Sequence, residues 1–310
     1  LIKKYPDNPH LYLKYYTNRE IYYEDSYNDI VSYKKKYDRW LNKSNLQKLN
    51  IEFIDSKNFV GSIGNLYALE TLLLANNLNI REKKKIFLVI EKNFKPRNGT
   101  LFEYFKDHIT IINEEFLSRD LIEFAKKLFV PLGACLDFNK NILPLDEAAN
   151  YVETIKEDQN ENKPLFKIKS NHKQEGLKQL EKFKLPKNAW YVTLCVREPG
   201  YRGETSKNTK EKFRNADPLN YLSAIKSIIS AGGYVFRMGH PTDKKMPKME
   251  GLIDYANSDY KSEFMDIFLA ATCNFCIGNS SGYFRIPRLF SIPVLLADGP
   301  KHAEYFSLRK

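Results

Sequence analysis

Strand-like and helix-like patterns alternate along the first half of the chain from residue 51. The apolar runs 51–55 and 86–90 predict strands, the second of the continuous kind that is buried in a parallel sheet. Residues 66–77 have the composition and spacing of a helix, 108–112 are a further strand candidate and 117–128 a further helix. Such alternation predicts an α/β domain with a parallel sheet.

The second half repeats this alternation more clearly. Ser262 is placed to cap a helix, and Gly232-Gly233 end another. The predicted strands are 190–196, 234–238, 251–255, 274–277 and 293–297, and the predicted helices are 218–231, 262–272 and 283–290. This order predicts a Rossmann-like domain, and two such domains would face each other across a cleft.

A charged, amide-rich stretch from Lys156 to Pro164 interrupts the pattern and predicts a domain boundary. We therefore expect a helical N-terminal segment at 1–48, a first Rossmann-like domain at 49–160 and a second Rossmann-like domain at 161–310. The N-terminal segment is rich in tyrosine, and its near-helical spacing favours a packing face over a surface that stacks bases or sugars.

Composition excludes several classes of protein. Hydrophobic residues make up 43% and charged residues 28% of 310 residues, which is typical of a folded protein rather than a disordered or fibrous one. No window has the roughly 18 uncharged apolar residues of a membrane span. No signal peptide opens the chain, and its first residue is Leu1 rather than Met, which leaves open that it is a piece of a longer product.

The formal net charge of +11 suggests an anionic partner, but lysine supplies most of it. A chain rich in Lys and Asn and poor in Arg is typical of an AT-rich genome, so we do not expect nucleic-acid binding. Arginine then marks positions where lysine would not serve. Six of the twelve arginines lie between Arg197 and Arg288.

The cysteines favour a structural interpretation. Cys273 and Cys276 form a C-x-x-C pair without the second pair or the histidines of a zinc site. We expect buried thiols, no metal site and no cofactor. Unpaired cysteines suit a reducing cytoplasm, and peripheral contact at the inner face of the membrane is left open.

Three predicted strands of the second half are each followed by groups suited to phosphate. Arg197 opens a loop that also carries Tyr201 and Arg202, and the strand at 234–238 contains Arg237 and is followed by Gly239 and His240. The third strand leads into the loop 278–282, whose Gly and Ser residues present backbone N–H groups ahead of a helix. In a parallel α/β sheet the carboxyl ends of the strands carry the ligand site, so we expect these groups to meet.

Several motifs are absent from the sequence. There is no Gly-x-Gly-x-x-Gly after a strand, no Walker A pattern and no Asp-x-Asp. A bound diphosphate would then be neutralised by cationic side chains and backbone dipoles in place of Mg²⁺.

The second half resembles a bacterial family of GT-B glycosyltransferases over about residues 189–300. The resemblance rests on the segments 196–201, 214–217, 233–239, 253–256, 265–269 and 275–282. Residues 266–285 are also similar to the nucleotide-binding region of α1,6-fucosyltransferases. This similarity implies that Arg197 binds the diphosphate, that Asp266 lies near the base, and that Ser280 and Ser281 hold phosphate.

The residues and the resemblance together give a set of candidate positions. The donor-binding candidates are Arg197, Tyr201, Arg202, Arg237, Gly239, Asp266, Gly278, Ser280, Ser281 and Gly282. A glycine turn in the first domain resembles the acceptor-side loop of GT-B enzymes through Gly61, Gly64 and Asn65, although it could simply allow close helix packing. Asp266 could equally be a solvated carboxylate on a helix face, and His240 a loop residue with no role.

We therefore expect a metal-independent, inverting glycosyltransferase that moves a hexosyl or fucosyl unit from a nucleotide-sugar to an acceptor. A GDP-sugar is the favoured donor, and the acceptor is expected to be a glycan of polysaccharide biosynthesis. The best candidates for catalysis are Glu198 and His240, with Glu204 and Asp55 as further candidates for the general base. The alternatives are a non-catalytic nucleotide- or sugar-binding protein on the same fold and a nucleotide-sugar epimerase. The oligomeric state is open.

Overall fold

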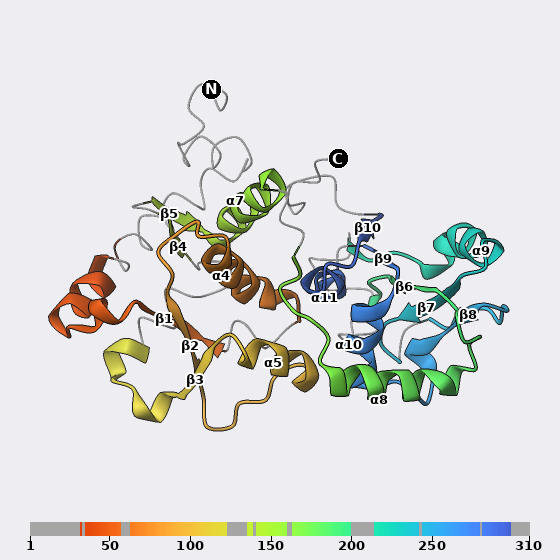
Figure 1. Cartoon of the computed structure of the whole chain (residues 1–310), viewed down its shortest axis with the longest axis horizontal. Coiled ribbons are helices and arrows are strands. Elements are labelled where there is room, and N and C mark those ends of the chain that lie inside the picture. Colours follow the sequence, from red (N-terminus) through yellow and green to blue (C-terminus); the bar gives the residue numbers. More distant parts are fainter. Residues whose placement is uncertain are drawn as a thin grey trace, which may run out of the picture. The chain divides into compact units, whose positions relative to one another are not determined.

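The chain divides into two compact units, each with its own parallel sheet (Figure 1). The computed structural model describes residues 32, 35–56, 63–122, 135–138, 141–159, 163–199, 214–241, 244–279 and 281–298. The division falls between Asn162 and Lys163, and Asn98–Leu101 is grouped with the second unit. The sequence placed this boundary between residues 160 and 161.

The first unit contains a three-stranded parallel sheet in the order β1-β2-β3. The strands are β1 (Ile51–Asp55), β2 (Lys85–Ile90) and β3 (Thr110–Asn113). The short 3-10 helix η2 (Ile63–Leu66) leads into α4 (Tyr67–Asn77), which lies between β1 and β2 in the chain. The three strands and α4 match the elements predicted from the sequence within two residues at each end.

Several elements of the first unit were not predicted. They are α5 (Gly99–Lys106), whose first three residues are grouped with the second unit, the 3-10 helices η1 (Leu46–Leu49) and η3 (Glu114–Phe116), the antiparallel hairpin β4 (Cys135–Phe138) with β5 (Asn141–Pro144), and α7 (Leu145–Asp158). Of the predicted helix at 117–128, the structure describes residues 117–122, and 119–122 are helical. Within the predicted helical N-terminal segment, residues 35–43 are helical and Tyr37 is buried, as expected for a packing face.

The second unit has a five-stranded, entirely parallel sheet in the order β10-β9-β6-β7-β8. Its strands are β6 (Tyr191–Cys195), β7 (Tyr234–Met238), β8 (Leu252–Ile253), β9 (Phe275–Gly278) and β10 (Val294–Leu296). Counted along the chain within this unit, the spatial order is 5-4-1-2-3, which is the Rossmann order read from the other edge. All five strands were predicted.

Helices cover both faces of this sheet, as the alternation of side chains along β6 requires. Val192 and Leu194 pack on one face with α9 (Leu222–Ser230), which follows the 3-10 helix η7 (Pro218–Tyr221). Tyr191 and Cys195 pack on the other face with α10 (Glu263–Thr272), against which α8 (Ser170–Leu180) also lies. Figure 1 shows α9 on the opposite side of the strands from α10 and α8.

The remaining elements of the second unit are short. They are the 3-10 helices η4 (Glu181–Phe183), η8 (Tyr255–Asn257) and η9 (Gly282–Phe284), and the helix α11 (Arg285–Leu289). Ser262 caps α10 as predicted, because its side chain accepts a hydrogen bond of 3.1 Å from the Met265 N–H. The helix α8 was not predicted, because its sequence is mostly polar and follows the polar stretch assigned to the boundary.

The predicted α/β class with two parallel-sheet domains is confirmed, and the cleft between them stays a prediction. In the part of the chain that the structure describes, no helix has the length and apolar character needed to cross a membrane.

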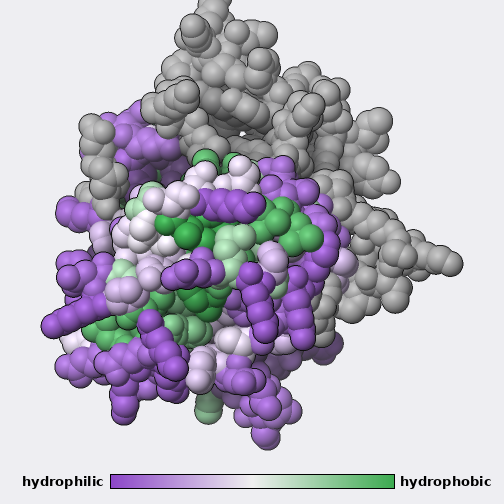
Figure 2. All heavy atoms as spheres, turned by 90° about the vertical axis from the view of Figure 1, so that its right-hand side faces the viewer, coloured by the Kyte–Doolittle hydropathy of each residue, from purple (hydrophilic) through white to green (hydrophobic). Residues whose placement is uncertain are grey.

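Figure 2 shows that on the face of the second unit at the right of Figure 1, hydrophobic residues gather between hydrophilic ones. The edge strand β8, whose two residues are half-buried, belongs to this side of the unit.

Candidate functional site

The strand order places a topological switch point between β6 and β9. From β6 the chain proceeds to β7 and β8 on one side, and it then crosses to β9 and β10 on the other. Ligands of open α/β sheets bind at the carboxyl ends of the strands at such a point, because the loops diverge there. Arg197 follows β6, and the loop 278–282 starts at the end of β9, so two of the three predicted phosphate-binding segments start at the switch point.

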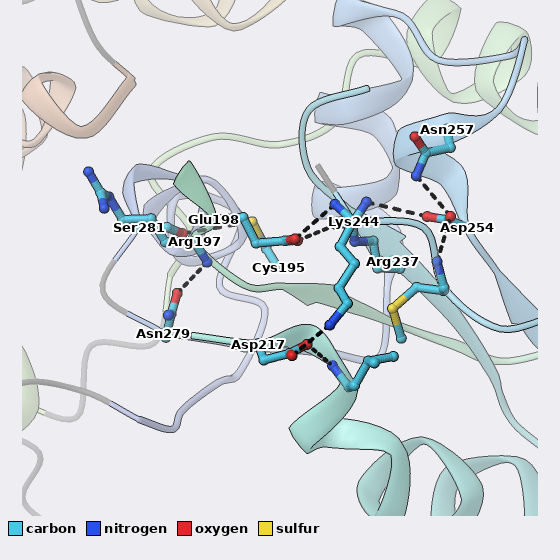
Figure 3. A network of polar contacts seen from close by, with 12 residues as sticks. Cys195, Arg197, Glu198, Asp217, Arg237, Lys244, Asp254, Asn257, Asn279 and Ser281 are labelled. Atoms are coloured by element: carbon cyan, nitrogen blue, oxygen red, sulfur yellow. Dashed lines mark hydrogen bonds and ion pairs between the residues drawn. The ribbon is translucent and has the colours of Figure 1, made fainter. Parts of the chain in front are cut away.

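Arg197 is half-buried, and both its backbone and its guanidinium are held by amide side chains. Its N–H donates a hydrogen bond of 2.7 Å to Oδ1 of Asn279, and its Nη1 donates to Oδ1 of Asn215. Its carbonyl oxygen accepts a bond of 3.1 Å from the Ala216 N–H. In Figure 3 the side chain of Arg197 extends away from Glu198 and Arg237.

The loop after β9 turns tightly against the end of β6. A Cβ added to Gly278 would meet the carbonyl oxygen of Cys195 at 3.2 Å, so the close pairing of the two strands favours glycine there. The Ser281 N–H donates a bond of 2.6 Å to the Asn279 carbonyl oxygen, and the Ser281 Oγ is 3.7 Å from the Cys195 Sγ. Gly282 opens η9 immediately afterwards, so this loop leads into a helical turn as the sequence predicted.

Arg237 occupies a different environment from the one expected of a phosphate ligand. Its side chain is 0% exposed, and its Nη2 forms an ion pair with Oε1 of Glu198. Its Nη1 is 3.3 Å from Oδ1 of Asp254. The two carboxylates compensate the buried guanidinium, which would otherwise be very costly to desolvate. This burial argues against direct contact between Arg237 and a diphosphate.

Glu198 is buried by the same network, which Figure 3 shows in full. Its Oε2 accepts a hydrogen bond of 3.0 Å from the Lys244 N–H, so both carboxylate oxygens have donors. Asp254 likewise accepts from the Met246 N–H at 3.0 Å and from Nδ2 of Asn257 at 2.8 Å. Through Glu198 and Asp254, Arg237 therefore connects the segment 244–246 and the loop after β6 to the sheet. In this network Glu198 is poorly placed for the general base that the sequence suggested.

Asp266 lies in the first turn of α10 and is held by Lys261. The Nζ of Lys261 donates to Oδ1 at 2.7 Å and to Oδ2 at 3.0 Å, and it also lies 5.1 Å from the centre of the Tyr255 ring. Burial raises the pKa of Asp266, and the charge and hydrogen bonds of Lys261 oppose that shift. The predicted contact with a nucleotide base would compete with Lys261 for this carboxylate.

Of the remaining candidates for the general base, His240 is half-buried in the loop after β7, and Asp55 at the end of β1 is 4% exposed. Gly239, which precedes His240, has a φ of +149°, a backbone conformation that residues with an L side chain rarely adopt. Glu204 lies outside the described residues. His240 therefore follows the end of β7, and β7 pairs directly with β6, the strand that Arg197 follows.

Other predicted positions lie outside the described residues. These are Gly61, Tyr201, Arg202 and Ser280. On the acceptor side, Gly64 and Asn65 lie in η2, which directly precedes α4, so the predicted glycine turn includes a helical turn.

The cysteines of the second unit are buried free thiols, as the sequence predicted. Cys195, Cys273 and Cys276 are all buried without a disulfide. Burial raises the pKa of the Cys273 thiol to about 11, so it is protonated at neutral pH. Among the described residues, no three His, Cys, Asp or Glu side chains are grouped so that they could hold a metal ion.

The sequence did not single out two amides and two charged residues that organise the site. Asn279 and Asn215 hold Arg197, while Asp254 and Lys244 complete the network around Arg237. Both asparagines belong to segments that carry the family resemblance. Their individual roles depend on contacts between residues 18 and 82 positions apart, which no local pattern shows.

No protein-family model matches the chain, and a search of curated proteins found no match. Two solved glycosyltransferases are similar in structure. The family 9 glycosyl transferase from Veillonella parvula DSM 2008 has a TM-score of 0.48 at 11% identity, covering 81% of this chain and 84% of that one. ADP-heptose LPS heptosyltransferase II from E. coli has a TM-score of 0.44 at 10% identity, covering 79% and 83%. Both likenesses are weak, and neither identifies a donor, an acceptor or a reaction for this chain.

Proposed function

We propose that the chain is a glycosyltransferase that binds a nucleotide-sugar at the switch point of its second unit. The observation that carries the proposal is the convergence of Arg197 and the loop 278–282 between β6 and β9. A guanidinium beside a Gly/Ser loop that leads into a helical turn offers positive charge and hydrogen-bond donors to one anion. The family resemblance of residues 189–300 supports a sugar diphosphate as that anion.

The proposed reaction is attack of an acceptor hydroxyl on the anomeric carbon of the donor sugar. The bond from that carbon to the diphosphate oxygen breaks, and the nucleoside diphosphate leaves with its negative charge. Arg197 and hydrogen-bond donors of the loop 278–282, such as the Ser281 hydroxyl, stabilise this charge, so the reaction needs no metal ion. A base takes the proton of the hydroxyl, and direct displacement inverts the anomeric centre.

We propose His240 rather than Glu198 as that base. His240 is half-buried in a loop beside the switch point, whereas both oxygens of Glu198 already accept hydrogen bonds in a buried network. Asp266 would recognise the base of the nucleotide, with a GDP-sugar as the favoured donor. The first unit would bind the acceptor, a glycan of polysaccharide biosynthesis, near Gly64 and Asn65.

The proposal is tested by thermal unfolding in the presence of nucleotides. We expect one of GDP, UDP, CDP and ADP, together with its nucleotide-sugar, to raise Tm in buffer with EDTA. A ligand at 100 times its Kd stabilises the folded state by about 2.7 kcal/mol, which corresponds to a shift of several degrees. No shift with any nucleotide would contradict the donor site, and a shift that EDTA abolishes would contradict metal independence.

A second measurement separates a transferase from the alternatives. The donor that raises Tm is incubated with the protein for hours and analysed for released nucleoside diphosphate. A transferase is expected to release it slowly to water and faster with a suitable glycan. Binding without any release would indicate a non-catalytic protein, and conversion of the donor to an isomer would indicate an epimerase.

A further inference from the structure

A single buried amide, Asn279, joins three segments that meet at the switch point. It directly follows β9, its side chain is 0% exposed, and it uses all of its polar groups. Its N–H approaches the Cys195 carbonyl oxygen at 3.4 Å, and its own carbonyl oxygen accepts from the Ser281 N–H at 2.6 Å. These backbone contacts join the end of β6 to the loop 278–282.

The side chain of Asn279 makes the remaining connections. Its Oδ1 accepts a hydrogen bond of 2.7 Å from the Arg197 N–H, and its Nδ2 donates one of 3.0 Å to the Arg214 carbonyl oxygen. Asn215, the residue after Arg214, accepts from the Arg197 guanidinium. The amide thus holds both the backbone of Arg197 and the segment that orients its side chain.

We infer that Asn279 is a positioning residue that orients Arg197 and the loop 278–282 for diphosphate binding. This inference rests on the proposed function, because it assigns Asn279 a role in that same site. An amide suits this place because it offers one acceptor and one donor in a fixed plane. If either the Arg197 N–H or the Arg214 carbonyl oxygen lost its hydrogen bond to Asn279, Arg197 and the loop would no longer be held in the geometry that binds the anion.

The decisive variant is Asn279→Asp, which keeps the shape and the acceptor but replaces the donor toward Arg214. Burial raises the pKa of the introduced carboxyl group, and the hydrogen bond from the Arg197 N–H opposes that shift. Above that pKa the carboxylate faces the Arg214 carbonyl oxygen without a proton, and below it the carboxyl O–H donates as the amide does. We expect the variant to bind the nucleoside diphosphate at least tenfold more weakly than the wild-type protein at pH 8. The ratio of the two Kd values is expected to fall toward one as the pH is lowered below that pKa.

A ligand-free measurement tests the anchoring itself. In Asn279→Ala the Arg197 N–H loses its acceptor, so hydrogen exchange of the peptide that contains Arg197 is expected to become faster. The matched control is Ile225→Ala, which empties a buried position of α9 in the same unit. It is expected to lower Tm while leaving both the exchange of that peptide and the Kd of the diphosphate unchanged.

The outcomes separate this inference from the proposed function. No binding of any diphosphate by the wild-type protein would contradict the proposed function. Binding that is equal in Asn279→Asp and wild type at pH 8, or unchanged exchange around Arg197 in Asn279→Ala, would overturn the role of Asn279. If Ile225→Ala weakens binding as much as Asn279→Asp does, general loss of stability explains the effect and the inference is wrong. Should Asn279→Ala not fold, the pH dependence of Asn279→Asp decides the question alone.

Discussion

At the scale of single residues, the environments of Arg197 and Glu198 diverge although they are neighbours in the chain. Arg197 is half-buried and held by two amides, while Glu198 is buried against the guanidinium of Arg237. Alternation of side chains along an extended segment sends successive residues to opposite sides. One position is therefore available for a ligand, and the next stabilises the sheet.

The buried network predicts a stability role for Glu198. Among the described residues, replacing Glu198 by Ala leaves Asp254 as the carboxylate partner of the fully buried Arg237 side chain. Removal of one partner of a buried ion pair costs about 3–5 kcal/mol, so we expect a loss of this order in the free energy of unfolding measured in urea. The exposed Glu181→Ala is the control and is expected to change it by less than about 0.5 kcal/mol. Unchanged stability in Glu198→Ala would show that the carboxylate is not structural.

The sequence predicted that Arg197 and the loop 278–282 lie at the carboxyl ends of strands in one sheet, but not how their side chains are partnered. Arg197 and the loop 278–282 could be placed there because strand ends are visible in the apolar pattern. No local pattern separates Arg237 from Arg197, because both lie at the end of an apolar strand. Only the partner of each guanidinium distinguishes them, an amide for Arg197 and two carboxylates for Arg237.

At the scale of elements, the helices α8 and α10 pack unusually closely. Gly176 of α8 is buried, and a Cβ placed on it would lie 2.0 Å from Cδ2 of Phe268 in α10. A larger residue would separate the two helices or displace the ring. The glycine is therefore required by packing, because in a helix interior it is otherwise less favourable than alanine.

This contact predicts that Gly176→Ala destabilises the protein. Gly176→Ala should gain about 1 kcal/mol from helix propensity, but forcing a methyl group into a filled core costs about 1–3 kcal/mol. With a separation of only 2.0 Å we expect the clash to dominate, giving a lower Tm and a smaller free energy of unfolding. Gln174→Ala, on the exposed face of the same helix, serves as the comparison and should be nearly neutral. A stabilised Gly176→Ala variant would contradict the packing of α8 on α10.

Elements with strong local signals were predictable, and those without them were not. The strands of the second unit and α10 have apolar runs and a capping Ser262, so their bounds follow from the sequence. The helix α8 is polar apart from a few positions, so its sequence alone indicates a linker. Its few apolar positions can be recognised as a packing face only once the fold of the second unit is known. The helix α7 was missed for a related reason, since its mean composition is hydrophilic.

At the scale of the whole molecule, two separate parallel sheets follow from the two blocks of alternating strands and helices. Each block can bury its own core, so the chain forms two units. In the second unit the edge strands β8 and β10 have two and three residues, and short edges limit pairing with other chains. Chain order alone does not reveal the switch point, because the crossing from β8 to β9 is decided by which strands pair.

The measurement that tests the central claim most directly is a calorimetric titration of the wild-type protein, Arg197→Ala and Arg119→Ala with the nucleoside diphosphate that raises Tm most. Arg119 is an exposed arginine of the first unit, so its replacement removes the same charge away from the switch point. A charged hydrogen bond contributes about 1.5–3 kcal/mol, so Arg197→Ala should weaken binding by roughly 10- to 150-fold while Arg119→Ala binds as the wild type does. Equal affinity in all three proteins would contradict the assignment of the switch point as the donor site.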